Sequence, residues 1–177
     1  MKNTSYKTAI TRKALSAPMK WLQAKGLLQG NGLDYGCGKG SDADKVGFEK
    51  FDPYFFNDRG TLFDLSDYCG GTPKAKTFKT ITCNYVLNVV DIETQTQILI
   101  DLWNHLEHGG TAYFSVRRDI PKAGFQGKTF HRYVELDFAQ KLVENSGFAI
   151  YSIYKRKADF ALQARNDSAH LKSIENL

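Results

Sequence analysis

A glycine-rich turn is the first place in this sequence where residue types and spacing indicate chemistry. The segment 33–40 reads Leu-Asp-Tyr-Gly-Cys-Gly-Lys-Gly, between a short strand candidate at 32–35 and a helix candidate at 41–46. Gly36 and Gly38 have no Cβ, so a ligand can approach the main chain closely there. Ligands of open α/β sheets bind at the carboxyl ends of the strands. The pattern therefore predicts a cofactor site on this turn, and a tight turn without a ligand is the structural alternative.

The acid in front of the glycines discriminates between cofactors. Asp34 precedes Gly36, and the glycine spacing differs from the G-x-G-x-x-G fingerprint of dinucleotide-binding proteins. A carboxylate at this position repels a pyrophosphate but suits an ammonium group. We therefore expect S-adenosylmethionine, whose methionine end carries an ammonium, rather than NAD. An NAD-dependent oxidoreductase is the alternative that the glycine spacing disfavours.

A second acid, Asp52, directly follows the expected second strand. A carboxylate there can accept both ribose hydroxyls, as the acid about 20 residues after the glycines does in dinucleotide folds. The alternative is an ordinary turn aspartate before Pro53. Tyr54 or Phe55 would then cover the adenine. The residues expected to bind the cofactor are Asp34, Tyr35, Gly36, Cys37, Gly38, Asp52, Pro53, Asn84 and Tyr85.

Basic residues provide the candidate contacts to a substrate. The segment from Met1 to Leu33 contains six Lys or Arg and no Asp or Glu, and such a segment attracts polyanions such as nucleic acid. Solvated surface charge is the alternative. Two further arginines follow the expected strand at 111–116, at the same sheet edge as the glycine turn. The expected substrate contacts are Arg12, Lys13, Arg117 and Arg118, and the candidates for a catalytic role are Asn84, Asp119 and His131.

The whole sequence is typical of one globular α/β domain. It has 177 residues, 42% of them hydrophobic, and a formal net charge of +5. Helices and strands alternate along the chain, which predicts a mostly parallel sheet with an antiparallel C-terminal strand. We divide the chain into a basic helical extension, 1–30, and a globular unit, 31–177. Helices are expected at 16–24, 41–46 (capped by Ser41 or Asp42), 91–108 (ended by Gly109-Gly110) and 131–146, and strands at 32–35, 48–51, 78–83, 111–116, 148–154 and 159–164.

Cysteine use and hydropathy indicate the compartment. Cys37, Cys69 and Cys83 lie far apart, and an odd number of cysteines favours free thiols in a reducing compartment. No apolar run approaches the ~20 residues that span a bilayer, and the N-terminus lacks the apolar region of a signal peptide. We expect a cytoplasmic protein without membrane contact. His105 and His108 are three apart on an expected helix, but no third ligand has metal-site spacing, so no metal site is expected.

These motifs resemble the class I S-adenosylmethionine-dependent methyltransferases over about residues 31–118, which implies a Rossmann-like methyltransferase fold. A closer resemblance is to the methyltransferases associated with DNA phosphorothioation systems and to their short bacterial and phage relatives. The motifs that carry it lie in segments 8–18, 34–40, 52–53 and 85–89.

The resemblance implies a role for each motif. Asp34, Gly36 and Gly38 would line the methionine end of the cofactor, and Asp52 would bind the ribose. Asn84 and Tyr85 would border the transferred methyl group. They stand where amino-group DNA methyltransferases have an Asp-Pro-Pro-Tyr box, but both prolines are missing. Candidates for the acid that contacts adenine are Asp64 and Asp67.

We therefore expect an S-adenosylmethionine-dependent methyltransferase with nucleic acid as the candidate acceptor. The alternative is a non-catalytic S-adenosylmethionine-binding accessory module of a nucleic-acid-modification system. The sequence leaves the acceptor atom and the oligomeric state open.

Overall fold

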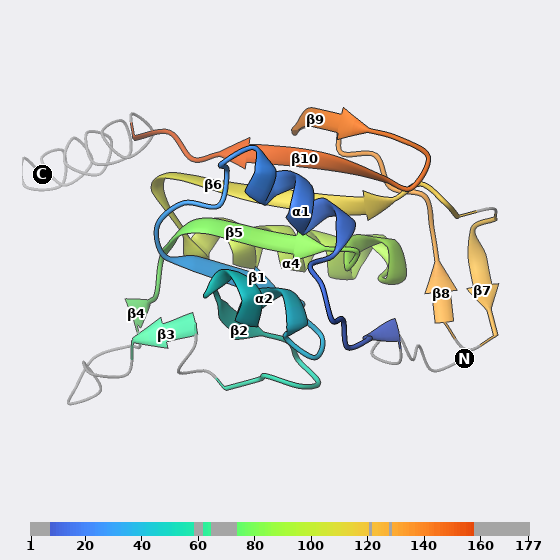
Figure 1. The fold of residues 1–177 in the computed structure, drawn as a ribbon, viewed down its shortest axis with the longest axis horizontal. Coiled ribbons are helices and arrows are strands. Elements are labelled where there is room, and N and C mark those ends of the chain that lie inside the picture. The colour runs from blue at the N-terminus through green and yellow to red at the C-terminus, as the bar shows by residue number, and fades with distance from the viewer. Residues whose placement is uncertain (1–7, 59–61, 65–73, 121, 128, 158–177) are drawn as a thin grey trace, which may run out of the picture.

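A six-stranded sheet forms the centre of the molecule (Figure 1). The computed structural model describes residues 8–58, 62–64, 74–120, 122–127 and 129–157. The strand order is β2-β1-β5-β6-β10-β9; β2, β1, β5 and β6 are parallel, and β10 is antiparallel to both of its neighbours. The expected α/β class with an antiparallel C-terminal strand is confirmed. The strands are β1 (Gly32–Tyr35), β2 (Glu49–Phe51), β5 (Phe78–Asn84), β6 (Leu106–Arg117), β9 (Gln140–Glu144) and β10 (Phe148–Tyr154).

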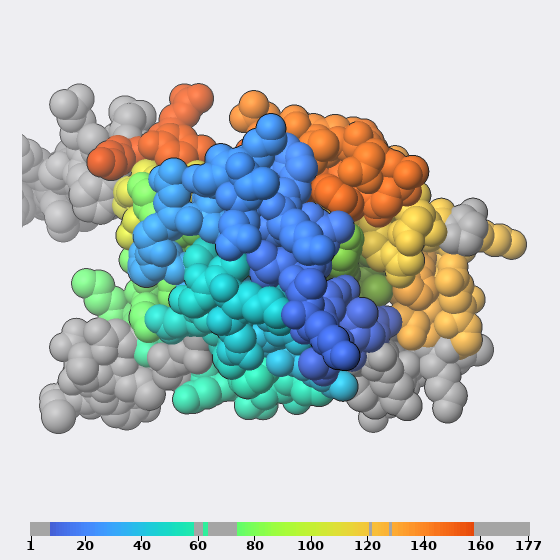
Figure 2. Space-filling model, in the orientation of Figure 1, coloured from blue at the N-terminus to red at the C-terminus, as the bar shows by residue number. Residues whose placement is uncertain are grey.

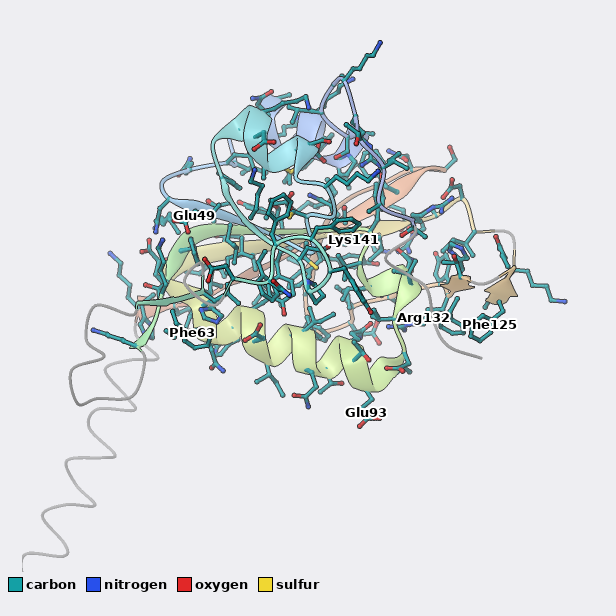
Figure 3. All side chains as sticks on the ribbon, turned by 90° about the horizontal axis from the view of Figure 1, so that it is seen from below. Glu49, Phe63, Glu93, Phe125, Arg132 and Lys141 are labelled. Atoms are coloured by element: carbon teal, nitrogen blue, oxygen red, sulfur yellow. The ribbon has the colours of Figure 1, made fainter. Side chains whose placement is uncertain are left out.

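Helices cover both faces of the sheet. In Figures 1 and 3, α1 (Ala17–Ala24) and α2 (Ser41–Val46) lie on one face and α4 (Ile92–His105) on the other. A 3-10 turn, η2 (Leu87–Val89), joins β5 to α4. Two small antiparallel pairs lie outside the main sheet: β3 (Phe63–Asp64) with β4 (Lys74–Ala75), and β7 (Gly124–Gln126) with β8 (Thr129–His131).

Two clusters of buried apolar side chains fill the two faces. Successive residues of a strand point to opposite faces; accordingly, Phe114 belongs to the cluster that contains Leu102 of α4, and Tyr113 to the cluster beneath α1. Met19 and Leu22 of α1 are fully buried in this second cluster. The segment that we set apart as an extension therefore contributes a helix to the core of the domain.

The helix expected at 131–146 is wrong. This segment forms the end of β8, a loop and the edge strand β9. Val143 of β9 pairs with Ile150 of β10, and Asn145 makes the turn between them by accepting the N–H groups of Gly147 and Phe148, at 2.8 and 3.0 Å. Pairing with β10 thus overrides the helical spacing of the apolar residues, because a strand at this edge still buries part of Leu142 and Val143.

Two expected helix ends are also wrong. Gly109 and Gly110 do not end α4, which already ends at His105; they lie inside β6. Neither Ser41 nor Asp42 caps α2, whose N-cap is Gly40 in the left-handed region, at φ +75°. The strand expected at 159–164 lies outside the described residues. Among the described residues, no helix is long and apolar enough to cross a membrane.

Candidate functional site

The glycine turn after β1 is closely covered by other parts of the chain. Gly36 and Gly38 adopt positive φ angles of +71° and +55°. The N–H of Gly36 donates to the carbonyl of Phe51 at 2.7 Å, which ties the turn to the end of β2. A Cβ on Gly36 would lie 2.4 Å from Val86, and a Cβ on Gly38 would lie 2.9 Å from Ala9. Both positions therefore require glycine for backbone conformation and for space.

A cavity of about 390 Å³ opens at the carboxyl ends of β1, β2 and β5, beside this turn. Its wall combines the glycine turn with N-terminal residues before α1 and with residues between β5 and α4. Sequence reasoning missed Ser16 and Asp42, which reach the cavity only because α1 and α2 pack together on one face. All nine residues predicted to bind the cofactor line this cavity: Asp34, Tyr35, Gly36, Cys37, Gly38, Asp52, Pro53, Asn84 and Tyr85.

Asp34 is a buried carboxylate in the cavity wall, 3% exposed. Its Oδ1 accepts the hydroxyl of Thr82 at 2.9 Å. Burial raises the pKa of Asp34 to about 7; the hydrogen bond from Thr82 and the nearby amide of Asn84 oppose the shift, and the charges of Asp42 and Asp52 add to it. With no cationic ligand, this carboxyl group binds a proton near neutral pH.

Asp52 makes the contacts of a turn aspartate and also lies in the cavity wall, where the ribose contact stays a prediction. Its Oδ2 accepts the N–H of Gly38 at 2.9 Å, and its Oδ1 accepts the N–H groups of Tyr54 and Phe55 at 2.9 and 3.3 Å. It thus shapes its own turn and fixes the glycine turn, while also lining the cavity. Each carboxylate oxygen has two lone pairs, so acceptor capacity remains for a ligand hydroxyl. Of the two aromatic candidates for adenine, Tyr54 lines the cavity and Phe55 is not part of its wall.

Asn84 and Tyr85 form the wall at the end of β5. Asn84 Oδ1 accepts the hydroxyl of Ser115 at 2.7 Å, whereas its buried Nδ2 lies near Asp34 but completes no hydrogen bond among the described residues. Tyr85 has a φ of +62°, and it is the sole non-glycine residue of the described chain in that region. Such conformations cost about 1–3 kcal/mol and cluster at functional sites. The strained backbone and the unsatisfied amide donor both indicate a binding role for this corner of the cavity.

Of the four predicted substrate contacts, one lines the cavity. Arg12 is part of the wall, whereas Lys13 is exposed and outside it. Arg117 also lies outside the wall and holds Asp119 in a two-bond pair, at 2.8 and 2.9 Å. Burial raises the pKa of Tyr85, and the charges of Arg12 and Arg117 both oppose this shift. The Arg117–Asp119 pair therefore lies near the Tyr85 corner of the cavity.

Arg118 has a structural environment that differs from our expectation. Its side chain, 5% exposed, donates to Glu135 at 3.0 Å, to the hydroxyl of Tyr151 at 2.7 Å and to Glu144. The centroid of the Tyr133 ring lies 4.3 Å from the guanidinium carbon. The guanidinium donors are used in these contacts, and Arg118 is not part of the cavity wall. The structure therefore does not support Arg118 as a substrate contact.

The predicted catalytic candidates are divided between the wall and its surroundings. Asn84 lines the cavity, whereas Asp119 and His131 do not. Burial, together with the charge of Arg117, lowers the pKa of His131, and the hydrogen bond from Arg117 lowers that of Asp119. At neutral pH His131 is therefore a neutral imidazole in β8, near an ionised Asp119 that Arg117 already binds.

The remaining residues singled out in the sequence are the histidine pair, the cysteines and the candidate adenine contacts. His105 ends α4 and His108 lies in β6, so the two do not share one helix face. Cys37 and Cys83 are free thiols, and Cys69 lies outside the described residues. Of the two candidate adenine contacts, Asp64 is the last residue of β3 and Asp67 lies outside the described residues.

Known structures resemble this fold at low sequence identity. TehB from Haemophilus influenzae has a TM-score of 0.51 and 14% identity, covering 82% of this chain and 64% of that chain. A hypothetical protein from Thermus thermophilus has a TM-score of 0.50 and 14% identity, covering 82% of this chain and 90% of that chain. Magnesium protoporphyrin IX methyltransferase from Synechocystis PCC 6803 with bound S-adenosylhomocysteine has a TM-score of 0.47 and 14% identity, covering 78% of this chain and 80% of that chain.

The likenesses to TehB and to the Thermus thermophilus protein show the fold alone, and they agree with the expected Rossmann-like α/β fold. No protein-family model and no curated protein matches the sequence. The narrower resemblance to phosphorothioation-associated methyltransferases is not tested by these structures and stays a prediction.

Proposed function

We propose that this chain is an S-adenosylmethionine-dependent methyltransferase whose cofactor binds in the cavity beside the glycine turn. The observation that carries the proposal is the charge of the cavity wall. Asp34, Asp42 and Asp52 are all buried carboxylates in that wall, exposed by 3%, 7% and 8%. Three such groups attract a cationic ligand and repel a pyrophosphate. S-adenosylmethionine carries a sulfonium and an ammonium, and the Rossmann-like fold is consistent with it.

Each part of the cofactor has a chemically suitable partner in the wall. The Asp34 carboxylate suits the ammonium, and Asp52 Oδ2, which accepts one N–H, retains a lone pair for a ribose hydroxyl. Tyr54 offers an aromatic face for adenine. The unsatisfied amide of Asn84 and the strained Tyr85 are assigned to the transferred methyl and its acceptor.

The reaction proposed is an in-line displacement at the sulfonium methyl. A lone pair of the acceptor forms the new bond to carbon while the carbon–sulfur bond breaks, and its electrons stay on sulfur as S-adenosylhomocysteine leaves. Because the methyl is already activated, the protein mainly aligns the two reactants and excludes water. Asp119 or His131 would accept a proton from the acceptor only by acting from outside the wall, near Tyr85.

Nucleic acid is the proposed class of acceptor. The supporting observation is the formal net charge of +5, with six cations and no acid between Met1 and Leu33. Lys13 and Lys20 are exposed and remain available for phosphates. If they bind duplex phosphates, affinity should fall with salt, with a log–log slope of about −0.9 per phosphate neutralised.

The second candidate is a non-catalytic S-adenosylmethionine-binding module. One observation favours it: among the described residues, neither candidate base belongs to the cavity wall. This candidate and the methyltransferase predict the same cofactor affinity but differ in turnover.

Calorimetry with S-adenosylmethionine, S-adenosylhomocysteine and NAD, followed by turnover with pooled DNA and RNA, tests the proposal. We expect binding of both S-adenosyl compounds, weaker or no binding of NAD, and formation of S-adenosylhomocysteine that depends on added nucleic acid. Binding without turnover on any nucleic acid would favour the accessory module. Equal or tighter binding of NAD would refute the cofactor assignment.

A further inference from the structure

We infer that Arg12 and Ser16 bind the carboxylate at the amino-acid end of S-adenosylmethionine, so that the segment before α1 is part of the cofactor site. This inference rests on the proposed function, because it assigns contacts in the same cavity. It moves Arg12 from the acceptor, where the sequence placed it, to the cofactor.

The segment before α1 is fixed against the glycine turn and α2. Ala9 occupies the space beside Gly38, where a Cβ would come within 2.9 Å. The N–H of Arg12 donates to Ser41 Oγ at 3.1 Å, and its carbonyl accepts Lys45 Nζ at 2.9 Å. Figure 2 shows the dark-blue N-terminal residues lying against the cyan residues that follow the turn. The main chain of Arg12 is therefore held in place at the cavity wall and does not form a free surface arm.

Ser16 has a buried hydroxyl that forms no hydrogen bond with the described residues. It is the N-cap residue of α1, a position where a serine side chain normally accepts a helix N–H. Here no such bond forms, and Pro18, in the first turn, has no N–H to donate. Ser16 is 5% exposed, lines the cavity, and its Oγ has no partner in the described part of the chain. A buried unpartnered hydroxyl is costly, so it indicates a ligand group at this point.

The charges near Ser16 match an α-amino acid, which carries an ammonium and a carboxylate on one carbon. Arg12 is the single cation among the described residues of the wall, which also holds three carboxylates. Asp42 lies beside Ser16, whose N–H it accepts at 2.9 Å. The charges of Arg12 and Asp42 shift the pKa of Tyr85 in opposite directions, which indicates that both lie near its hydroxyl. The positive end of the α1 dipole adds to the attraction for a carboxylate.

A ligand that lacks only the carboxylate tests this assignment directly. We would measure, by calorimetry, the affinities of S-adenosylmethionine and of decarboxylated S-adenosylmethionine for the full chain and for Arg12→Gln, Ser16→Ala and Lys13→Gln. The wild-type chain should prefer the intact cofactor at least about tenfold, because a guanidinium–carboxylate contact is a charge-assisted hydrogen bond. Arg12→Gln should remove most of this preference and Ser16→Ala a smaller part. Lys13→Gln is the matched control, because Lys13 is exposed and outside the wall, and it should keep the preference.

The outcomes separate this inference from the proposed function. Equal affinity of the wild-type chain for the two ligands would overturn the inference while leaving the cofactor assignment intact. A uniform loss for both ligands in Arg12→Gln would also overturn it, because that result means a purely structural role. If the wild-type chain binds neither ligand, the proposed function itself fails. Should Arg12→Gln not fold, Arg12→Lys and Ser16→Ala decide the question with the same ligand pair.

Discussion

Replacing Asp34 by asparagine should stabilise the ligand-free protein at alkaline pH while weakening cofactor binding. The change keeps the shape of the side chain and an oxygen that can accept the Thr82 hydroxyl. It removes a charge that burial disfavours, since the pKa of Asp34 is raised from 3.8 to about 7. A shift of about three pKa units corresponds to roughly 4 kcal/mol at 1.36 kcal/mol per unit. This is an upper value, because the protein also loses the stronger hydrogen bond that a carboxylate accepts.

The sign of the pH dependence follows from proton linkage. Between pH 4 and 7 the folded protein keeps the Asp34 proton, whereas the unfolded chain has released it. Asp34 therefore lowers the free energy of unfolding progressively as pH rises through this window. Above pH 7 its effect on the free energy of unfolding no longer changes with pH. Asp34→Asn lacks this contribution. The variant and the wild-type chain should differ little near pH 4 and by up to about 4 kcal/mol at pH 8.

Urea denaturation of both ligand-free proteins at pH 4.5, 6 and 8 would measure this difference. Asp44→Asn is a suitable control, because Asp44 has a 62% exposed side chain on α2, paired with Lys50 at the surface; surface pairs contribute only about 0–1 kcal/mol. A stability difference between Asp34→Asn and wild type that does not change with pH would refute the reasoning about this buried carboxyl group. So would undiminished S-adenosylmethionine affinity in the variant.

Three other predictions concern the same cavity. The affinity for S-adenosylmethionine, measured by calorimetry, should fall as pH drops below about 7, because the cation binds an ionised Asp34 and must displace its proton; a flat profile from pH 5.5 to 8 would contradict this. Asp52→Ala should lower that affinity at least tenfold and should also lower the melting temperature. The reason is that three backbone N–H groups lose a charged acceptor, at about 1.5–3 kcal/mol per bond. Unchanged affinity would place the ribose elsewhere. Gly38→Ala should weaken binding and destabilise the fold, because the new Cβ would clash with Ala9 and the backbone has a φ of +55°. Gly47→Ala is the control for backbone strain alone, because Gly47 has a φ of +72° and no atom lies within 4 Å of its Cβ position.

The residues that line the cavity beside the glycine turn could be predicted from the sequence because their signals are local. The glycine turn, the acid before it and the ends of neighbouring strands are all set by short segments, and parallel strands bring their carboxyl ends to one edge. The helix 131–146 was mispredicted for the opposite reason. Its apolar spacing is compatible with a helix, and only the neighbouring β10 makes an edge strand at 140–144 preferable. The Asn145 turn was the one local signal for the hairpin, since asparagine oxygens commonly accept N–H groups two residues ahead.

The place of the N-terminal segment in the cavity wall could not be predicted from the sequence, because it depends on contacts between residues that are far apart in the chain. Two cations before a helix start are unfavourable against the helix dipole, so the sequence indicates an anion near Arg12 and Lys13. The sequence could not separate the two residues. In the structure, Arg12 is bonded to Ser41 and Lys45 of α2 and lines the cavity, while its neighbour is exposed. The same packing buries Ser16 with an unused hydroxyl. One side of this short segment therefore lines the cavity, and the other side, with Lys13, is exposed.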